Sequence, residues 1–138
     1  MRLVLDTNVV ASAILWGGRP RLLLQAASER RIEIFVSMPM LGELTDILGR
    51  PKFAMKIAAS MLTVDQLIER YARLTSVVRS AATPRIAPDP DDDVVIGTAL
   101  AAKAEFIVTG DKLLLSVVEH QGVRIVTVAH AVESMDGH

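Results

Sequence analysis

Short apolar runs alternate with longer helical stretches along this chain, and the alternation constrains the fold more than any other feature. The runs that we expect to be strands cover residues 2–5, 33–36, 76–79, 105–108 and 123–126. Short apolar runs are typical of strands buried in a parallel sheet. With no strand–turn–strand signal between them, the order predicts βαβ units. We therefore expect an α/β fold in which helices cover both faces of a central parallel sheet of about five strands.

The stretches between the runs carry apolar residues at the three- and four-residue spacing of helices. Three predicted helices have typical first residues: Ser37 and Thr63 as N-caps, and Asp89 before Pro90. The predicted helices cover about 7–15, 20–30, 38–48, 52–60, 64–74, 90–104, 112–118 and 129–133. Residues 80–90 contain three prolines and predict a surface loop.

The 138 residues fit one domain, 1–138, that forms its own core. Hydrophobic residues make up 51% and charged residues 22%, a balance typical of a globular protein. No apolar run approaches the ~20 residues that cross a bilayer, and the chain starts with a strand instead of a signal peptide. Without cysteine there is neither a disulfide framework nor a thiolate metal site. We expect a cytoplasmic protein with no membrane partner.

Acidic residues follow the ends of the predicted strands. Asp6 ends the first run, and Glu43 lies in the helix after the second. Residues 91–93, all Asp, open the helix after the proline-rich loop, and Asp111 follows the fourth run. The carboxyl ends of parallel strands share one edge of the sheet, where ligands bind in open α/β folds. We therefore expect these carboxylates to converge at that edge.

Converging carboxylates suit a hard divalent cation. Mg²⁺ and Mn²⁺ prefer carboxylate and water oxygens, and a bound metal lowers the pKa of its water and stabilises developing negative charge. Without a cation the carboxylates repel one another, so such a cluster is costly unless it has a use. Asp6, Glu43, Asp92 and Asp111 are the predicted metal ligands and catalytic residues.

Asp92 is the preferred ligand of the Asp triple because it lies four residues before Ile96 and seven before Ala99, on the inward face of the helix. Asp93 is turned about 100° away and stays a candidate for a second metal or a supporting place. Three polar residues are further supporting candidates, and each could equally be a turn or cap residue. They are Asn8, Ser37 and Thr109.

Each acid also has a purely structural explanation. Asp6 and Asp111 could cap the helices that follow them. Glu43 could pair with Arg50, and residues 91–93 complement the positive end of their helix. The four positions together, in this order, are much less expected by chance than any one of them.

The net charge of −1 argues at first against a nucleic acid partner. If four of the 16 acids bind a metal, however, 12 remain against 15 bases, which leaves 15 − 12 = +3. The bases also form groups, which are either a nucleic acid surface or ordinary solvated helix ends. These groups are Arg19 with Arg21, Arg30 with Arg31, and Arg50 with Lys52 and Lys56.

Four segments around the acids match a known set of motifs in order. They are residues 5–9 (LDTNV), 43–53 (ELTDILGRPKF), 89–99 (DPDDDVVIGTA) and 107–111 (IVTGD). In these segments the chain resembles PIN-domain nucleases, especially small bacterial toxins of toxin–antitoxin systems similar to virulence-associated protein C. The resemblance covers nearly the whole length.

This resemblance implies a Rossmann-like αβα sandwich and Mg²⁺- or Mn²⁺-dependent endoribonuclease activity on RNA phosphodiester bonds. It further implies a toxin that forms a homodimer and is blocked by an antitoxin, with Asp6, Glu43, Asp92 and Asp111 as the acidic quartet. The chain has Leu113 where relatives often carry a further acid, and 87–88 (AP) where they often carry a base. Substrate-binding residues are therefore not assigned.

Two other functions remain open from the sequence. A catalytically inactive PIN-fold module would bind RNA or protein without cleaving it. A phosphatase-type enzyme would use Asp6 as a nucleophile, but its usual partner acid would fall at position 8, which is Asn8.

Overall fold

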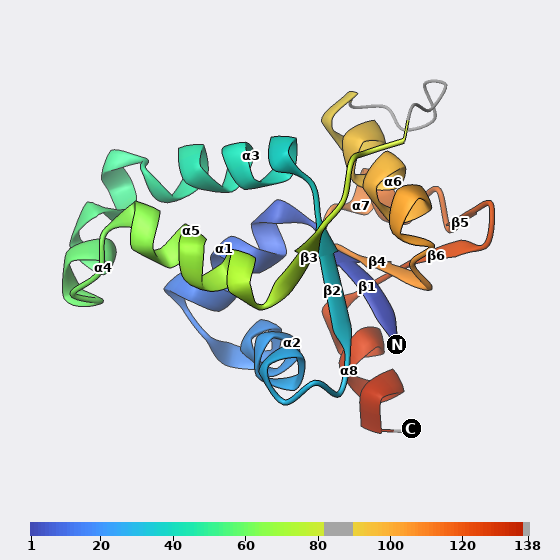
Figure 1. Ribbon diagram of the computed structural model, residues 1–138, viewed down its shortest axis with the longest axis horizontal. Helices are drawn as coiled ribbons and strands as arrows, with labels where there is room; N and C mark the ends of the chain where they lie inside the picture. The colour runs from blue at the N-terminus through green and yellow to red at the C-terminus, as the bar shows by residue number, and fades with distance from the viewer. Residues whose placement is uncertain (82–89, 137–138) are drawn as a thin grey trace.

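The computed structural model describes residues 1–81 and 90–136, in which six strands form one sheet in the order β3-β2-β1-β4-β6-β5 (Figure 1). Neighbouring strands are parallel except β5 and β6, which are antiparallel. The strands are β1 (Arg2–Leu5), β2 (Glu33–Val36), β3 (Thr75–Val77), β4 (Phe106–Val108), β5 (Glu119–His120) and β6 (Val123–Val126). The predicted α/β fold around a largely parallel sheet is confirmed.

Helices connect the parallel strands, as the alternation predicts. They are α1 (Thr7–Leu15), α2 (Gly18–Ser28), α3 (Met38–Leu48), α4 (Ala54–Ala59), α5 (Val64–Arg73), α6 (Pro90–Ala102), α7 (Lys112–Leu115) and α8 (Val128–Asp136), with a 3₁₀ turn, η1 (Pro51–Phe53). Within the described residues, no helix is both long and apolar enough to cross a membrane.

The first strand, β1, lies at the centre of the sheet. Leu3 is in register with Ile34 of β2 on one side and Phe106 of β4 on the other. Leu3, Val4 and Leu5 are all buried, which explains why this strand is apolar on both faces. The chain adds β2 and β3 on one side of β1 and then crosses over to add β4 on the other. The strand order therefore reverses between β1 and β4, the place where open α/β sheets bind ligands.

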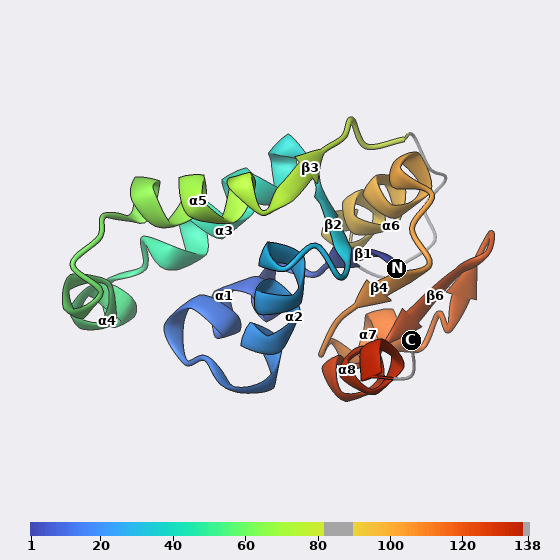
Figure 2. The same cartoon turned by 60° about the horizontal axis from the view of Figure 1, so that its bottom comes forward.

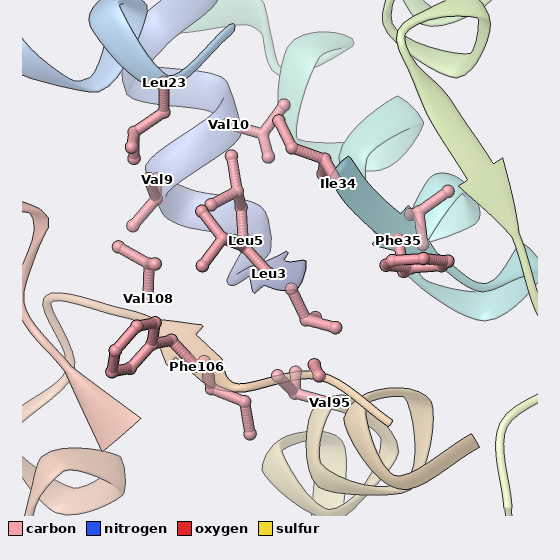
Figure 3. Close-up of a cluster of buried hydrophobic side chains, with 14 of the residues drawn as sticks. Leu3, Leu5, Val9, Val10, Leu23, Ile34, Phe35, Val95, Phe106 and Val108 are labelled. Atoms are coloured by element: carbon pink, nitrogen blue, oxygen red, sulfur yellow. The ribbon is translucent and has the colours of Figure 1, made fainter. Parts of the chain in front are cut away.

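Helices pack against both faces of the sheet. Val9 and Val10 of α1 and Leu23 of α2 lie on one side of β1, and Val95 of α6 lies on the other (Figure 3). Helix α8 packs beside α2 on the same side (Figure 2). The long crossover from β3 to β4 thus places α6 against the second face of the sheet, where it contacts β1, β2 and β4.

Helices α3 and α5 pack side by side and extend away from the sheet, with η1 and α4 at their far end (Figures 1 and 2). We call these two helices with η1 and α4 the α3–α5 arm. Helix α5 begins where predicted, after Thr63. Thr63 Oγ1 accepts from Gln66 N at 3.1 Å, and Gln66 Oε1 accepts from Thr63 N at 2.9 Å. This reciprocal capping box fixes the start of α5 and hence the return of the chain to the sheet.

Some local predictions differ from the structure. Strand β5 is absent from the predicted set, because two residues show no periodicity. Gln121 and Gly122, with φ of 48° and 86°, form the tight turn that joins it to β6. The predicted helix over 112–118 ends at Leu115, and the one over 52–60 is divided into η1 and α4. The Asp89 cap and most of the loop predicted at 80–90 lie outside the described residues.

Two glycines in helices provide a matched test of the packing around α6. A β-carbon on Gly97 would lie 2.4 Å from the carbonyl oxygen of Ala81, whereas one on Gly42 would meet nothing within 4 Å. We expect Gly97→Ala to lower the free energy of unfolding by about 1–3 kcal/mol through overpacking. Gly42→Ala should raise it by up to about 1 kcal/mol, since alanine favours the helix. Urea denaturation measures both, and an equal effect of the two changes would contradict this packing.

Candidate functional site

The candidate site lies at the carboxyl ends of β1 and β4, where the strand order reverses. Asp6 directly follows β1, and Thr109 and Asp111 follow β4. A pocket of about 440 Å³ opens there, and both carboxylates line it. Its other lining residues are Asn8, Val9, Ser12, Pro20, Gly110 and Val128.

Asp6 is held in place from three directions. Its backbone N–H donates to the carbonyl of Val108 at 2.9 Å, which extends the pairing of β1 with β4 by one residue. Its Oδ1 accepts from Thr7 N at 2.8 Å, and its Oδ2 accepts from Thr109 Oγ1 at 2.7 Å. With only 7% of its surface exposed, Asp6 is a fixed and largely desolvated carboxylate.

Burial is the main cause that raises the pKa of Asp6 above its ordinary value of 3.8. The hydrogen bonds from Thr109 and Thr7 act in the opposite direction, because they stabilise the charged form. The nearby carboxylate of Asp111 raises the pKa further by repulsion. The balance is a carboxylate whose negative charge is costly at this buried position, and a bound cation would offset that cost.

Asp111 is half-buried and shares a partner with Asp6. The Thr109 hydroxyl that donates to Asp6 also accepts from Asp111 N at 3.0 Å. Asp111 Oδ1 accepts from Leu113 N at 2.9 Å and so caps α7. Both helix caps considered from the sequence, at Asp6 and at Asp111, are therefore present. Capping engages one oxygen of Asp111 and does not remove it from the pocket that it lines.

The remaining predicted acids lie elsewhere along the same edge. Glu43 is half-buried and lines a separate cavity of about 340 Å³, together with Asp46 of its own helix and Val94 of α6. Asp92, in the first turn of α6, is 7% exposed, and Asp93 is half-buried. Among the side chains that the structure describes, no three of His, Cys, Asp or Glu lie close enough together to hold a metal ion. A site made from all four predicted acids thus stays a prediction.

The three supporting candidates differ in their placement. Asn8 is exposed and lines the pocket of Asp6, and Thr109 bridges Asp6 and Asp111. Ser37 occupies the N-cap position of α3 but makes no capping bond. Its hydroxyl lies 2.8 Å from that of Thr98, and both side chains are fully buried. Thr98 was not among the predicted residues, and its only signal was a polar residue within the apolar stretch of α6.

The residues at the pocket fit a hard divalent cation. Asp6 and Asp111 offer carboxylate oxygens and Asn8 an amide oxygen, all hard donors. Mg²⁺ is commonly held by one or two carboxylates, with water and substrate phosphate filling its other positions. The raised pKa of Asp6 and its repulsion by Asp111 are what a cation would offset. The pair therefore suits Mg²⁺ or Mn²⁺.

Comparison with known proteins identifies the family. Residues 2–113 match the model of the PIN domain, so the chain belongs to the PIN-domain family, as its motifs predict. In fold it is similar to a chain in the crystal structure of VapBC2 from Rickettsia felis bound to a DNA fragment from their promoter. That similarity has a TM-score of 0.62 at 15% identity and covers 92% of this chain and 98% of the other. No curated protein matches the sequence.

The buried charge of Asp6 predicts how stability depends on pH. Because its folded-state pKa is raised, the folded chain binds this proton more tightly than the unfolded chain does. The free energy of unfolding should therefore fall as pH rises from about 3.8 through the raised pKa. Asp6→Asn removes the titration, while its amide can still accept from Thr7 N and donate to Thr109 Oγ1.

We expect Asp6→Asn to be more stable than the wild type above the raised pKa, with the difference vanishing at acidic pH. Urea denaturation in EDTA over a pH series measures this. Glu119→Gln is the control, since it removes one carboxylate at an exposed position on β5. Parallel profiles for the wild type and Asp6→Asn would contradict the raised pKa.

Proposed function

We propose that this PIN-domain protein is a Mg²⁺- or Mn²⁺-dependent endoribonuclease that hydrolyses RNA phosphodiester bonds. The observation that carries the proposal is the desolvated carboxylate of Asp6, raised in pKa and facing Asp111 at the reversal point of the sheet. Two neighbouring carboxylates repel each other, which lowers the stability of a fold, but the same pair can bind a divalent metal.

The roles of the residues follow from their contacts. Asp6 and Asp111 would hold the metal, and Glu43, Asp92 and Asp93 are proposed to complete the acidic site. When bound, the metal would lower the pKa of a water and stabilise charge on the phosphate. The Thr109 hydroxyl donates to the Asp6 carboxylate and accepts from the backbone N–H of Asp111, so it fixes the Asp6 side chain and the backbone at Asp111. Asn8 is exposed in the same pocket and suited to hydrogen-bond a phosphate oxygen or a water.

The proposed partners are an RNA substrate, a cognate antitoxin and a second copy of the chain. The proposal of a toxin held by an antitoxin draws support from the family and from the similar fold found in a VapBC2 structure. We further propose a homodimer that acts in the cytoplasm.

Cleavage of RNA tests the proposal directly. Purified protein should cut single-stranded RNA with Mg²⁺ or Mn²⁺ and not in EDTA. Asp6→Asn should lower the rate by about 100-fold or more, since even indirect partners of a metal cost 10–100-fold. Asp65→Asn is a control because Asp65 is an exposed acid in the first turn of α5. Unchanged cleavage by Asp6→Asn would refute its role as a ligand.

Separate Asp92→Asn and Asp93→Asn variants decide between the two acids of α6. Asp92 is the more buried, and we expect its loss to reduce cleavage more than loss of Asp93. Far-ultraviolet circular dichroism of both variants establishes that they fold. A larger loss with Asp93→Asn would reverse the assignment.

A catalytically inactive binding module is the second candidate. It is favoured by one observation, that Glu43 lines a different cavity from Asp6 and Asp111. Thermal melting with and without Mg²⁺ separates the two functions. A metal at 100 times its dissociation constant adds about 2.7 kcal/mol of stability by linkage. We expect a raised midpoint in the wild type and none in Asp6→Asn, whereas no shift in either would favour the inactive module.

A further inference from the structure

Trp16, the only tryptophan of the chain, is a large apolar side chain that lies on the surface. It follows the last residue of α1, and 61% of its surface is exposed. The ring of Phe53 meets it edge to face, with centroids 6.5 Å apart and planes at 76°. Phe53 is half-buried and packs against the core, so its contact with the indole holds Trp16 in place. An exposed, anchored aromatic ring is the element on which unpaired bases stack.

Two lysine side chains lie against these two aromatic rings, one at each ring. The Lys56 ammonium lies 4.2 Å from the centroid of the Trp16 ring, and the Lys52 ammonium lies 5.0 Å from that of Phe53. We call Trp16, Phe53, Lys52 and Lys56 the Trp16 platform. The Arg21 guanidinium lies beside Gly17, the residue after Trp16, because a β-carbon on Gly17 would lie 3.6 Å from Arg21 Cζ.

The sequence around the platform carries one sign of charge. Residues 7–28 and 47–64, which include all of α1, α2, η1 and α4, contain no Asp or Glu. Over the same residues there are five cations in a chain whose net charge is −1. These are Arg19, Arg21, Arg50, Lys52 and Lys56. Such a local excess attracts a phosphate backbone, which the acidic pocket alone would repel.

One face of α1 joins the platform to the candidate site. Asn8, Ser12 and Trp16 follow one another at four-residue spacing, which places them on the same side of the helix. Asn8 and Ser12 both line the pocket of Asp6 and Asp111. In both views α1 runs from the end of β1 towards α4 (Figures 1 and 2). A helix rise of 1.5 Å per residue puts Trp16 about 12 Å along the axis from Asn8.

We propose that the Trp16 platform binds an unpaired base of single-stranded RNA by stacking, with Lys52 and Lys56 on the adjacent phosphates. The strand then follows α1 to the pocket of Asp6, so the platform selects unpaired RNA and positions it. This step rests on the proposed nuclease function, although binding at the platform needs neither metal nor cleavage. A purely apolar partner surface would not need lysines beside the aromatic rings. The charges therefore favour a nucleic acid as the occupant.

Binding without cleavage tests the platform. In EDTA, a short single-stranded oligoadenylate should quench the fluorescence of Trp16, which reports on this site alone because the chain has no other tryptophan. Anisotropy of the labelled oligonucleotide then gives the affinity of each variant. Trp16→Leu should bind about tenfold more weakly, whereas Trp16→Phe should retain most of the affinity, since stacking needs a ring and not only apolar bulk.

The two lysines are tested by salt dependence. Lys52→Gln and Lys56→Gln should each reduce the slope of log affinity against log salt by about 0.7, the value of one phosphate contact on a single strand. Lys103→Gln is the matched control, because Lys103 is exposed beyond the end of α6, next to the amino end of β4. Its slope should equal that of the wild type. A duplex of the same length should bind more weakly, since its bases are already stacked.

The outcomes separate this inference from the proposed function. Platform-dependent binding without any cleavage in Mg²⁺ or Mn²⁺ would support the platform and refute the nuclease. Cleavage with undiminished oligonucleotide affinity in Trp16→Leu would refute the platform alone. Equal binding of duplex and single strand would also refute it. Fluorescence that changes with protein concentration and not with oligonucleotide would assign the platform to a second copy of the chain instead.

Discussion

The charge of Asp6, which directly follows the buried residues of β1, is the constraint on which the rest of the site depends. Strand β1 is paired on both sides, and the Asp6 N–H continues that pairing to Val108. The backbone of Asp6 is therefore fixed at the centre of the sheet, and its carboxylate can turn towards water only by giving up the hydrogen bonds from Thr7 and Thr109. Thr7 and Thr109 stabilise the charge in place but do not compensate for its desolvation. What they preserve is an oriented anion, ready for a ligand of opposite charge.

The elements that could be predicted are those whose local sequence pattern matches their packing in the folded chain. The first helix was predicted with its observed bounds, because an acid precedes Thr7 and two glycines, Gly17 and Gly18, follow its end with positive φ. The final strand was also predicted residue for residue, since three of its four residues are apolar and Gly122 precedes it in a turn. The place of Asp6 at a strand end followed from the same pattern.

Other features depend on contacts that no local pattern encodes. The spacing of Glu43 fixes its direction about the axis of α3 but not the distance from that axis to the sheet, and Glu43 lines a different cavity from Asp6. Ser37 has the sequence of a cap, yet its hydroxyl faces Thr98, which is 61 residues away. The Trp16 platform likewise joins α1 to η1, so its members are recognised only once the α3–α5 arm is in place.

The two edges of the sheet bear on how this protein can associate. At one edge, β5 contributes only Glu119 and His120, and at the other, β3 covers only Thr75–Val77. An incoming strand needs a row of unpaired backbone groups, and such short edges offer few of them. Association by continuation of the sheet is therefore disfavoured. Contacts with other chains fall instead to the helical surfaces, where side-chain chemistry and not backbone pairing decides the partner.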